Sequence, residues 1–191
     1  MTPDKKFTIN YLKSQVSAKR FDHILSVAEH AKNLAIIYNE NADNAELAGL
    51  LHDLTREWPF DTVIEFMQHR LIGINDDERN HPILLHGKVA SIVAKEKFNI
   101  DNQDILNSVS NHTLGSKNMS QLEMIIFISD TLTSLKNIDK NKYQLVLDTA
   151  SKSLINATNL VYDLTYKHLV ETNTPIAKEF YDNWCANKNQ L

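Results

Sequence analysis

The chain has few of the residues that build turn-rich or cross-linked folds. Its 191 residues include one cysteine, four glycines and four prolines. The single cysteine, Cys185, excludes an internal disulfide and suits a reducing compartment, so we expect a cytoplasmic protein. An all-β protein needs many tight turns and therefore more glycine and proline, whereas helices need little of either.

Long apolar runs and clustered positive charge are also missing. The longest uninterrupted apolar run covers only residues 124–128, whereas a helix that crosses a bilayer needs about 20 apolar residues. The first residues lack the apolar stretch of a signal peptide. Lys and Arg number 20 against 24 Asp and Glu, which gives a net charge of −4. These features argue against nucleic-acid and membrane partners.

Helical spacing of apolar residues recurs along the chain, and the sequence predicts an all-α fold. One predicted helix, over residues 45–55, is apolar on nearly every side, as expected in the middle of a bundle. Residues 73–81 are predicted to form a polar loop. The other predicted helices cover residues 17–38, 60–69, 83–98, 101–111, 122–135, 142–157, 159–171 and the segment from Pro175 onward.

Capping signals predict where three of these helices begin. Asp43 followed by Glu46 indicates a capping box before the apolar helix, and Ser120 followed by Glu123 indicates a second one. Thr174 precedes Pro175 and would cap the last helix, with the proline at its first position.

Metal-competent side chains interrupt five of the predicted helices. His52 and Asp53 fall on the most apolar helix, and Asp130 follows an apolar run. An unpaired charge in a core is costly, so these groups must be satisfied either by hydrogen bonds or by a metal. Facing helices of a bundle can assemble a metal site from such side chains. The full set is His23, His52, Asp53, His86, His112 and Asp130.

Imidazole nitrogens and carboxylate oxygens suit iron, manganese, zinc or, less well with this many histidines, magnesium. A carboxylate can bridge two such ions, and a water between them loses a proton near neutral pH. The resulting hydroxide is a nucleophile suited to in-line attack on phosphorus. The ligand types therefore favour a two-metal phosphohydrolase.

The residues around these ligands occur in five motifs. The motifs are Arg20-Phe21-Asp22-His23, Ala48-Gly49-Leu50-Leu51-His52-Asp53, His81-Pro82-Ile83-Leu84-Leu85-His86-Gly87, His112-Thr113-Leu114-Gly115 and Met119-Ser120-Gln121-Leu122-Glu123. As a set they resemble the HD-domain superfamily of metal-dependent phosphohydrolases. Within it they are similar to the YqeK-like branch, the bacterial symmetrical bis(5'-nucleosyl)-tetraphosphatases. The likeness covers residues 17–136 and extends more loosely to Ala177.

The resemblance implies two metal ions, typically iron, in a helical bundle. His23, His52, Asp53 and Asp130 would hold one ion and His86 and His112 the other, with Asp53 bridging them. It further implies symmetrical hydrolysis of diadenosine tetraphosphate to two ADP by a metal-bridging hydroxide, with Asp53 and His52 as the catalytic residues. The expected organisation is an N-terminal segment (1–16) packing on the bundle, an HD core (17–136) and C-terminal helices (137–191) completing the same domain.

Five further side chains are candidates for substrate contacts. Each has a structural alternative: an arginine can pair with a carboxylate or offset a helix dipole, and a lysine can face solvent. Trp58 and Phe60 could stack on an adenine or pack in the core. The five candidates are Arg20, Arg56, Lys88, Thr113 and Lys136.

The segment after Asp130 departs from the family pattern. The family usually has Glu at the third following position, then Pro, and Arg two residues later, where this chain has Thr133, Ser134 and Lys136. Lysine keeps the positive charge but not the planar fork of arginine. Two alternatives therefore stay open: an HD-type nucleoside monophosphatase or cyclic-nucleotide phosphodiesterase, and a non-catalytic nucleotide-binding module. The sequence also leaves open whether the chain forms a homodimer.

Overall fold

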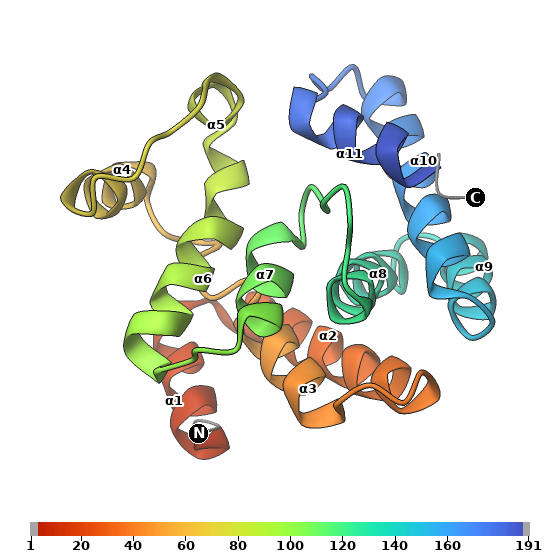
Figure 1. The fold of residues 1–191 in the computed structure, drawn as a ribbon, viewed down its shortest axis with the longest axis horizontal. Coiled ribbons are helices and arrows are strands. Elements are labelled where there is room, and N and C mark those ends of the chain that lie inside the picture. Colours follow the sequence, from red (N-terminus) through yellow and green to blue (C-terminus); the bar gives the residue numbers. More distant parts are fainter. Residues whose placement is uncertain (1–3, 189–191) are drawn as a thin grey trace.

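The computed structural model describes residues 4–188, and over that range it is built from helices without strands (Figure 1). The predicted all-α fold is confirmed. The α-helices are α1 (Lys5–Gln15), α2 (Ala18–Ile37), α3 (Ala42–Leu51), α4 (Phe60–His69), α5 (Asp76–Asn80), α6 (Leu85–Phe98), α7 (Gln103–Asn111), α8 (Gln121–Leu135), α9 (Lys140–Ala150), α10 (Leu154–Glu171) and α11 (Lys178–Lys188), and a 3-10 helix, η1 (Pro82–Leu84), precedes α6.

The centre of the bundle is α3, which packs against α2, α6, α7 and α8. Ala45 and all residues from Leu47 to Leu51 are buried, as the apolar sequence of this segment predicts. Gly49 allows α2 and α3 to approach closely, because a Cβ at this position would lie 2.7 Å from Cα of Ala28 on α2. The end of α3 is thereby held deep in the molecule.

The first and last helices of the described range join this bundle. Leu12 of α1 is fully buried, and the ring of Tyr11 meets that of Phe98 edge to face at 5.5 Å. At the other end, α9 and α10 pack on α8, and α11 packs on α10 (Figure 1). Buried side chains of α10 and α11, such as Tyr162 and Phe180, belong to the same hydrophobic core as α3.

The start and end of α3 differ from the prediction. Asn41 caps the helix, accepting a hydrogen bond from the amide of Asn44 at 2.9 Å, and the predicted capping box at Asp43 is wrong. Asn and Asp are equally good caps, so local sequence cannot choose between them. The helix ends at Leu51, and the residues from His52 onward form successive turns instead of a continuing helix.

A short helix replaces the predicted loop at 73–81. Asn75 and Glu78 form a capping box that begins α5, which the turn-rich composition of the segment hides. The second predicted capping box, at Ser120 and Glu123, is confirmed at the start of α8. Asn102 caps α7, which begins at Gln103, two residues after the start of the predicted helix at 101–111.

The C-terminal helix boundaries also differ. The break between α9 and α10 lies at residues 151–153, where Ser153 caps α10, and not near residue 158. The last helix begins at Lys178, three residues after the predicted start at Pro175. Its first amide donates to Oδ2 of Asp77 in α5 at 2.8 Å, a contact between segments far apart in sequence that no local pattern could indicate.

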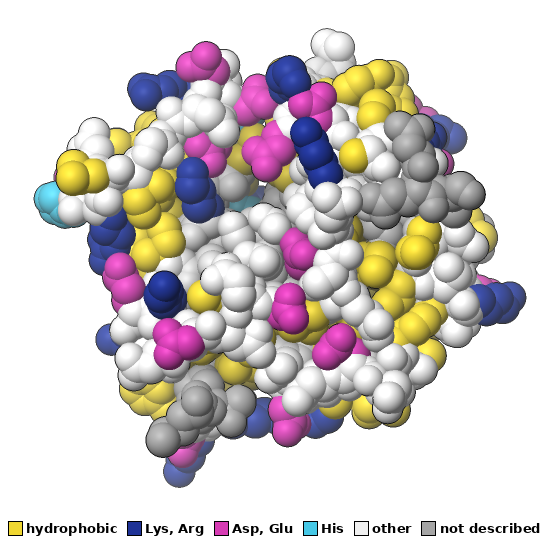
Figure 2. Space-filling view, in the orientation of Figure 1, with side chains coloured by type: hydrophobic (Ala, Val, Ile, Leu, Met, Phe, Trp, Pro, Cys, Tyr) yellow, Lys and Arg dark blue, Asp and Glu magenta, His cyan; other side chains and the backbone are white. Residues whose placement is uncertain are grey.

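Charged side chains of both signs are interspersed on the face drawn in Figure 2. Within residues 4–188, none of the helices combines the length and apolar character needed to cross a bilayer.

Candidate metal centre

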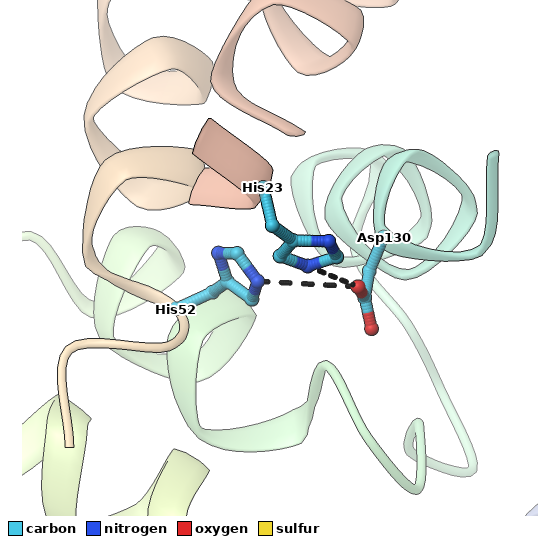
Figure 3. A group of neighbouring side chains, drawn as sticks. All are labelled: His23, His52 and Asp130. Atoms are coloured by element: carbon cyan, nitrogen blue, oxygen red, sulfur yellow. Dashed lines mark ion pairs between the residues drawn. The ribbon is translucent and has the colours of Figure 1, made fainter. Parts of the chain in front are cut away.

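Six predicted ligands from five separate segments meet near the buried end of α3. Figure 3 shows three of them, with His23 on α2 and His52 after α3 directed toward Asp130 on α8. The other three are Asp53, His86 at the start of α6 and His112, the residue that follows α7. The structure thus brings together all six residues singled out in the sequence.

Asp53 lies at the centre of the cluster, and its two oxygens face different histidines. Oδ2 is 3.4 Å from Nε2 of His52 and 3.7 Å from Nε2 of His23. Oδ1 is 3.2 Å from Nε2 of His86 and 3.7 Å from Nε2 of His112. One carboxylate therefore stands between two pairs of imidazoles, an arrangement suited to bridging two ions.

Asp130 lies beside only one of these two pairs of imidazoles, the pair formed by His23 and His52. Its Oδ1 lies 3.0 Å from Nε2 of His23 and 4.0 Å from Nε2 of His52 (Figure 3). The first group thus has two imidazoles and two carboxylates, and the second has His86, His112 and the other oxygen of Asp53. The allocation of these groups to two ions stays a prediction.

Backbone carbonyls orient three of the histidine rings. Nδ1 of His52 lies 2.7 Å from the Gly49 carbonyl, and Nδ1 of His112 lies 2.7 Å from the Val109 carbonyl. Nδ1 of His86 contacts the carbonyl of Ile83 in the same way. A carbonyl can only accept, so each Nδ1 carries the proton and Nε2 is the free coordinating atom.

The free nitrogens lack partners that would satisfy them within the protein. Nε2 of His23 and Nε2 of His52 are buried without a hydrogen-bond partner. Nε2 of His86 and Nε2 of His112 face each other at 2.9 Å. Buried polar atoms without partners are costly. Since all four nitrogens converge on carboxylate oxygens, the donor set fits divalent cations that prefer mixed nitrogen and oxygen ligands.

The pKa values of His86 and His112 move in opposite directions. Burial lowers the pKa of His86, and the neighbouring His112 acts in the same sense, against the hydrogen bond to Asp53. Burial would also lower the pKa of His112, but its hydrogen bond to Asp53 and the charges of Asp53 and Asp130 outweigh burial and raise that pKa. A proton shared by the two rings would therefore favour His112 over His86.

Both carboxyl groups of the cluster are held ionised. Burial acts to raise the pKa of Asp53, but the charge of His52 and the close approach of His112, His52 and His86 to its oxygens outweigh burial and lower the pKa. Burial acts to raise the pKa of Asp130 as well, but the imidazole of His23 at 3.0 Å and the charges of His52 and His112 outweigh burial and lower that pKa. An ionised carboxylate is the form that binds a metal.

Three of the five predicted substrate contacts border the cluster. Nη1 of Arg20 donates to Oδ2 of Asp53 at 2.8 Å, while its Nε is buried without a partner. Nε of Arg56 lies 4.0 Å from Oδ1 of Asp53. Oγ1 of Thr113 is 3.2 Å from Nε2 of His112.

The structure does not bring the two predicted lysines to the cluster. Nζ of Lys88 contacts Oε1 of Glu78 at 3.2 Å and the carbonyl of Gly73 at 3.3 Å. Two residues correspond to about 200° around a helix, so Lys88 faces away from His86. Lys136 is exposed at the end of α8, and no ion pair joins it to a ligand within residues 4–188.

At the departure from the family pattern, the side chain of Thr133 contacts a histidine outside the ligand set. Oγ1 of Thr133 is 3.1 Å from Nδ1 of His30, and the hydroxyl of Tyr143 on α9 is 3.3 Å from Nε2 of the same ring. Thr133 therefore faces His30 and α9. The absence of the family's Glu at this position does not change the ligand set around Asp53.

Sequence reasoning missed the carbonyls of Gly49, Ile83 and Val109, each three residues before a ligand histidine. The sequence carries no signal for these contacts, because every residue has a backbone carbonyl. It also left Trp58 and Phe60 undecided. A cavity of about 110 Å³ lies beside His86 and is lined by these two rings, Arg56 and Ile83, among other residues.

Comparison with known proteins assigns the chain to a family. Residues 20–135 match the model of the HD domain. This chain belongs to the HD-domain family. The family expected from the motifs is confirmed. All six candidate ligands of this HD chain lie inside the matched region.

Named relatives of this HD chain include symmetrical bis(5'-nucleosyl)-tetraphosphatases. The Halalkalibacterium halodurans protein of that name is 28% identical over 190 residues, 96% of this chain and 94% of that protein. The Staphylococcus aureus one is 32% identical over 118 residues, 62% and 60% of the two chains. A Mycoplasma genitalium protein named probable nicotinate-nucleotide adenylyltransferase/Ap4A hydrolase is 30% identical over 165 residues, 85% of this chain. The match spans only 46% of that relative.

A solved structure has the same fold from end to end. It is a Clostridium acetobutylicum protein described as a predicted HD superfamily hydrolase involved in NAD metabolism, 28% identical, with a TM-score of 0.93 over 100% of both chains.

Proposed function

We propose that this HD chain is a metal-dependent hydrolase that cleaves diadenosine tetraphosphate symmetrically into two ADP. The observation that carries the proposal is the position of Asp53, whose two oxygens face two separate pairs of imidazoles. The relatives named as symmetrical tetraphosphatases support this substrate. A cytoplasmic location accompanies the proposal, since a free cysteine such as Cys185 suits a reducing compartment.

We assign two divalent ions to this centre, with iron as the metal in the cell and manganese, zinc or magnesium as alternatives. His23, His52, Asp130 and Oδ2 of Asp53 would hold one, and His86, His112 and Oδ1 of Asp53 the other. When bound, two such ions lower the pKa of a water to near neutrality and offset the charge of a phosphoryl group.

Arg20 and Arg56 supply positive charge next to this centre. The guanidinium of Arg20 is positioned by Asp53, and its buried, unpartnered Nε–H can donate to a phosphate oxygen. Arg56 remains charged even though burial lowers its pKa, because a guanidinium does not deprotonate in proteins. Donors fixed before the substrate arrives orient a polyphosphate without further ordering cost. The hydroxyl of Thr113 adds a neutral donor beside His112.

The cavity beside His86 supports a nucleotide over a plain polyphosphate. Its lining includes two aromatic side chains, Trp58 and Phe60, and the apolar side chain of Ile83. Arg56 lines the same cavity. Phe60 and Ile83 are 45% and 47% exposed, so both are accessible from outside. An aromatic base stacks favourably on such surfaces, with the attached phosphates directed toward the arginine.

Product analysis tests the proposal. The protein is loaded anaerobically with iron, and separately with manganese, and is incubated with diadenosine tetraphosphate before ion-exchange chromatography. ADP as the sole product supports symmetrical cleavage, whereas AMP plus ATP contradicts it. Better turnover of a nucleoside monophosphate or a cyclic nucleotide would favour another HD-type phosphohydrolase.

A further inference from the structure

The turn at residues 113–116 directly follows the ligand His112 and runs toward α10 and α11 (Figure 1). His112 is the last residue before this turn, so its backbone is set by α7 on one side and by the turn on the other. Thr113 begins the turn, and its hydroxyl is 3.2 Å from Nε2 of His112 and 3.4 Å from Nε2 of His86. A shift of this turn would therefore move two groups at the second metal position.

Side chains from the C-terminal helices hold the carbonyls of this turn. The hydroxyl of Tyr162 on α10 donates to the carbonyl of Leu114 at 3.2 Å. Nδ2 of Asn183 on α11 donates to the same carbonyl at 3.3 Å and to that of Gly115 at 3.1 Å. Nδ2 of Asn187 donates to the carbonyl of Ser116 at 2.8 Å. The donors are buried, where a lost partner costs more than it would at the surface.

The fit between the turn and Tyr162 leaves no free space. Gly115 has a φ of +66°, and a Cβ added there would lie 1.8 Å from the Tyr162 oxygen. Only glycine combines this left-handed conformation with so close an approach. The turn therefore rests against the tyrosine in one defined position.

The same helix α11 also contacts the segment that leads to His86. Its first amide, at Lys178, donates to Oδ2 of Asp77 in α5, and η1 and His86 follow α5 in the chain. Through Asp77 and Asn183, α11 thus joins the segment before His86 to the turn after His112. These are the two histidines of the second metal group.

We propose that Tyr162 and Asn183 are positioning residues for the second metal group, acting through the Leu114–Gly115 carbonyls on His112 and Thr113. The inference rests on the two-ion centre of the proposed function. It gives the C-terminal helices a specific role: their buried polar side chains hold the turn after His112, whereas none of the hydrogen bonds from Tyr162 or Asn183 reaches the segments that carry His23, His52 and Asp130.

Stepwise metal titration tests this inference. Apo protein is titrated with Mn²⁺, with free ion counted by electron paramagnetic resonance, for the wild type and for a Tyr162→Phe/Asn183→Leu double variant. We expect one binding step to weaken by about tenfold or more, as for other residues that orient metal ligands, and the other to stay within twofold. Tyr143→Phe is the matched control, because its hydroxyl contacts His30 away from the cluster, and it should bind like wild type.

A double-mutant cycle identifies which step is affected. His112→Ala removes the second group, so adding Tyr162→Phe and Asn183→Leu to it should leave the remaining step unchanged. Equal weakening of both steps, or no change in either, in a protein with wild-type circular dichroism would overturn the inference. If the double variant does not fold, Tyr162→Phe alone, which removes one oxygen atom, is titrated in its place. Its loss of Mn²⁺ affinity should be smaller and should again affect only one binding step.

The readout separates this inference from the choice of substrate. Two-ion binding without tetraphosphate hydrolysis would contradict the proposed substrate and leave the role of Tyr162 and Asn183 standing. A wild-type chain that binds fewer than two ions would overturn the two-ion centre and this inference together.

Discussion

The Nε2 atoms of His86 and His112 lie 2.9 Å apart, although both rings direct Nδ1 at a backbone carbonyl. Two neutral rings in this orientation would meet lone pair to lone pair, so a positive charge must lie between them. The pKa of His112 is raised and that of His86 is lowered, so a proton in this contact favours His112. A metal ion would take the place of that proton, and its binding should release it.

The arginines, and not the lysines, should govern substrate turnover. Arg56→Ala removes a guanidinium beside Asp53, and a hydrogen bond to a charged group contributes about 1.5–3 kcal/mol. We therefore expect kcat/KM for diadenosine tetraphosphate to fall about 10- to 100-fold. Lys88→Ala and Lys136→Ala, which remove charges away from the cluster, are the controls and should change it less than about twofold. A loss at Lys136 as large as that at Arg56 would contradict the placement of substrate contacts.

Trp58 should contribute to base recognition. Trp58→Leu keeps an apolar side chain in the cavity but removes the ring surface on which a base could stack. Stacking on an aromatic side chain contributes about 1–3 kcal/mol per base, so KM for diadenosine tetraphosphate should rise about tenfold. Hydrolysis of bis-p-nitrophenyl phosphate, which carries no nucleobase, should change little. An equal loss on both substrates would show that Trp58 only supports the fold.

Gly49 should be sensitive to the smallest substitution. Gly49→Ala would place a Cβ 2.7 Å from Cα of Ala28, forcing α2 and α3 apart. Overpacking of this kind costs about 1–3 kcal/mol, which should lower Tm by several degrees in a chain of this size. Gly73→Ala is the control, because a Cβ there meets nothing within 4 Å. Similar Tm values for the two variants would contradict the tight contact between α2 and α3.

His30 should make stability depend on pH. Burial lowers its pKa and nearby Lys136 acts in the same direction, while the carbonyl of Ser26 and the charge of Glu29 oppose the shift. The ring also contacts the hydroxyls of Thr133 and Tyr143 on the helices packed against it. The unfolded chain therefore binds this proton at a higher pH than the folded one, and stability should fall as pH drops through about 6.5.

His30→Gln keeps a polar side chain of similar reach but cannot titrate. The urea midpoint of the apo variant should fall less than that of apo wild type between pH 8 and pH 5.5. An identical pH dependence in the two proteins would show that His30 does not contribute.

The ligands were predictable because a core tolerates a polar group only when it is satisfied. His52, Asp53 and Asp130 stood out against apolar neighbours, and the motifs around them added the family. Their neighbours were harder to assign. Lys88 lies only two residues from His86, and its place on the opposite side of α6 became apparent only with its partner Glu78 on an unpredicted helix.

Contacts between distant segments were beyond the reach of local patterns. Asn183 and Leu114 are 69 residues apart, and Asp77 and Lys178 are 101 apart. Neither Asn183 nor Tyr162 differs in its local sequence from ordinary helical residues. The start of α11 was misplaced for the same reason, since its first amide, at Lys178, is bound by Asp77 on α5 and not by the predicted cap, Thr174.

The metal content and activity of Asp53→Ala test the account most directly, because this carboxylate faces all four imidazoles. Wild type loaded with iron or manganese should hold two ions per chain by mass spectrometry and convert diadenosine tetraphosphate to ADP. The variant should lose both the ions and the hydrolysis, with circular dichroism close to that of wild type. A metal-free Asp53→Ala protein that cleaves the substrate at the wild-type rate would contradict the account.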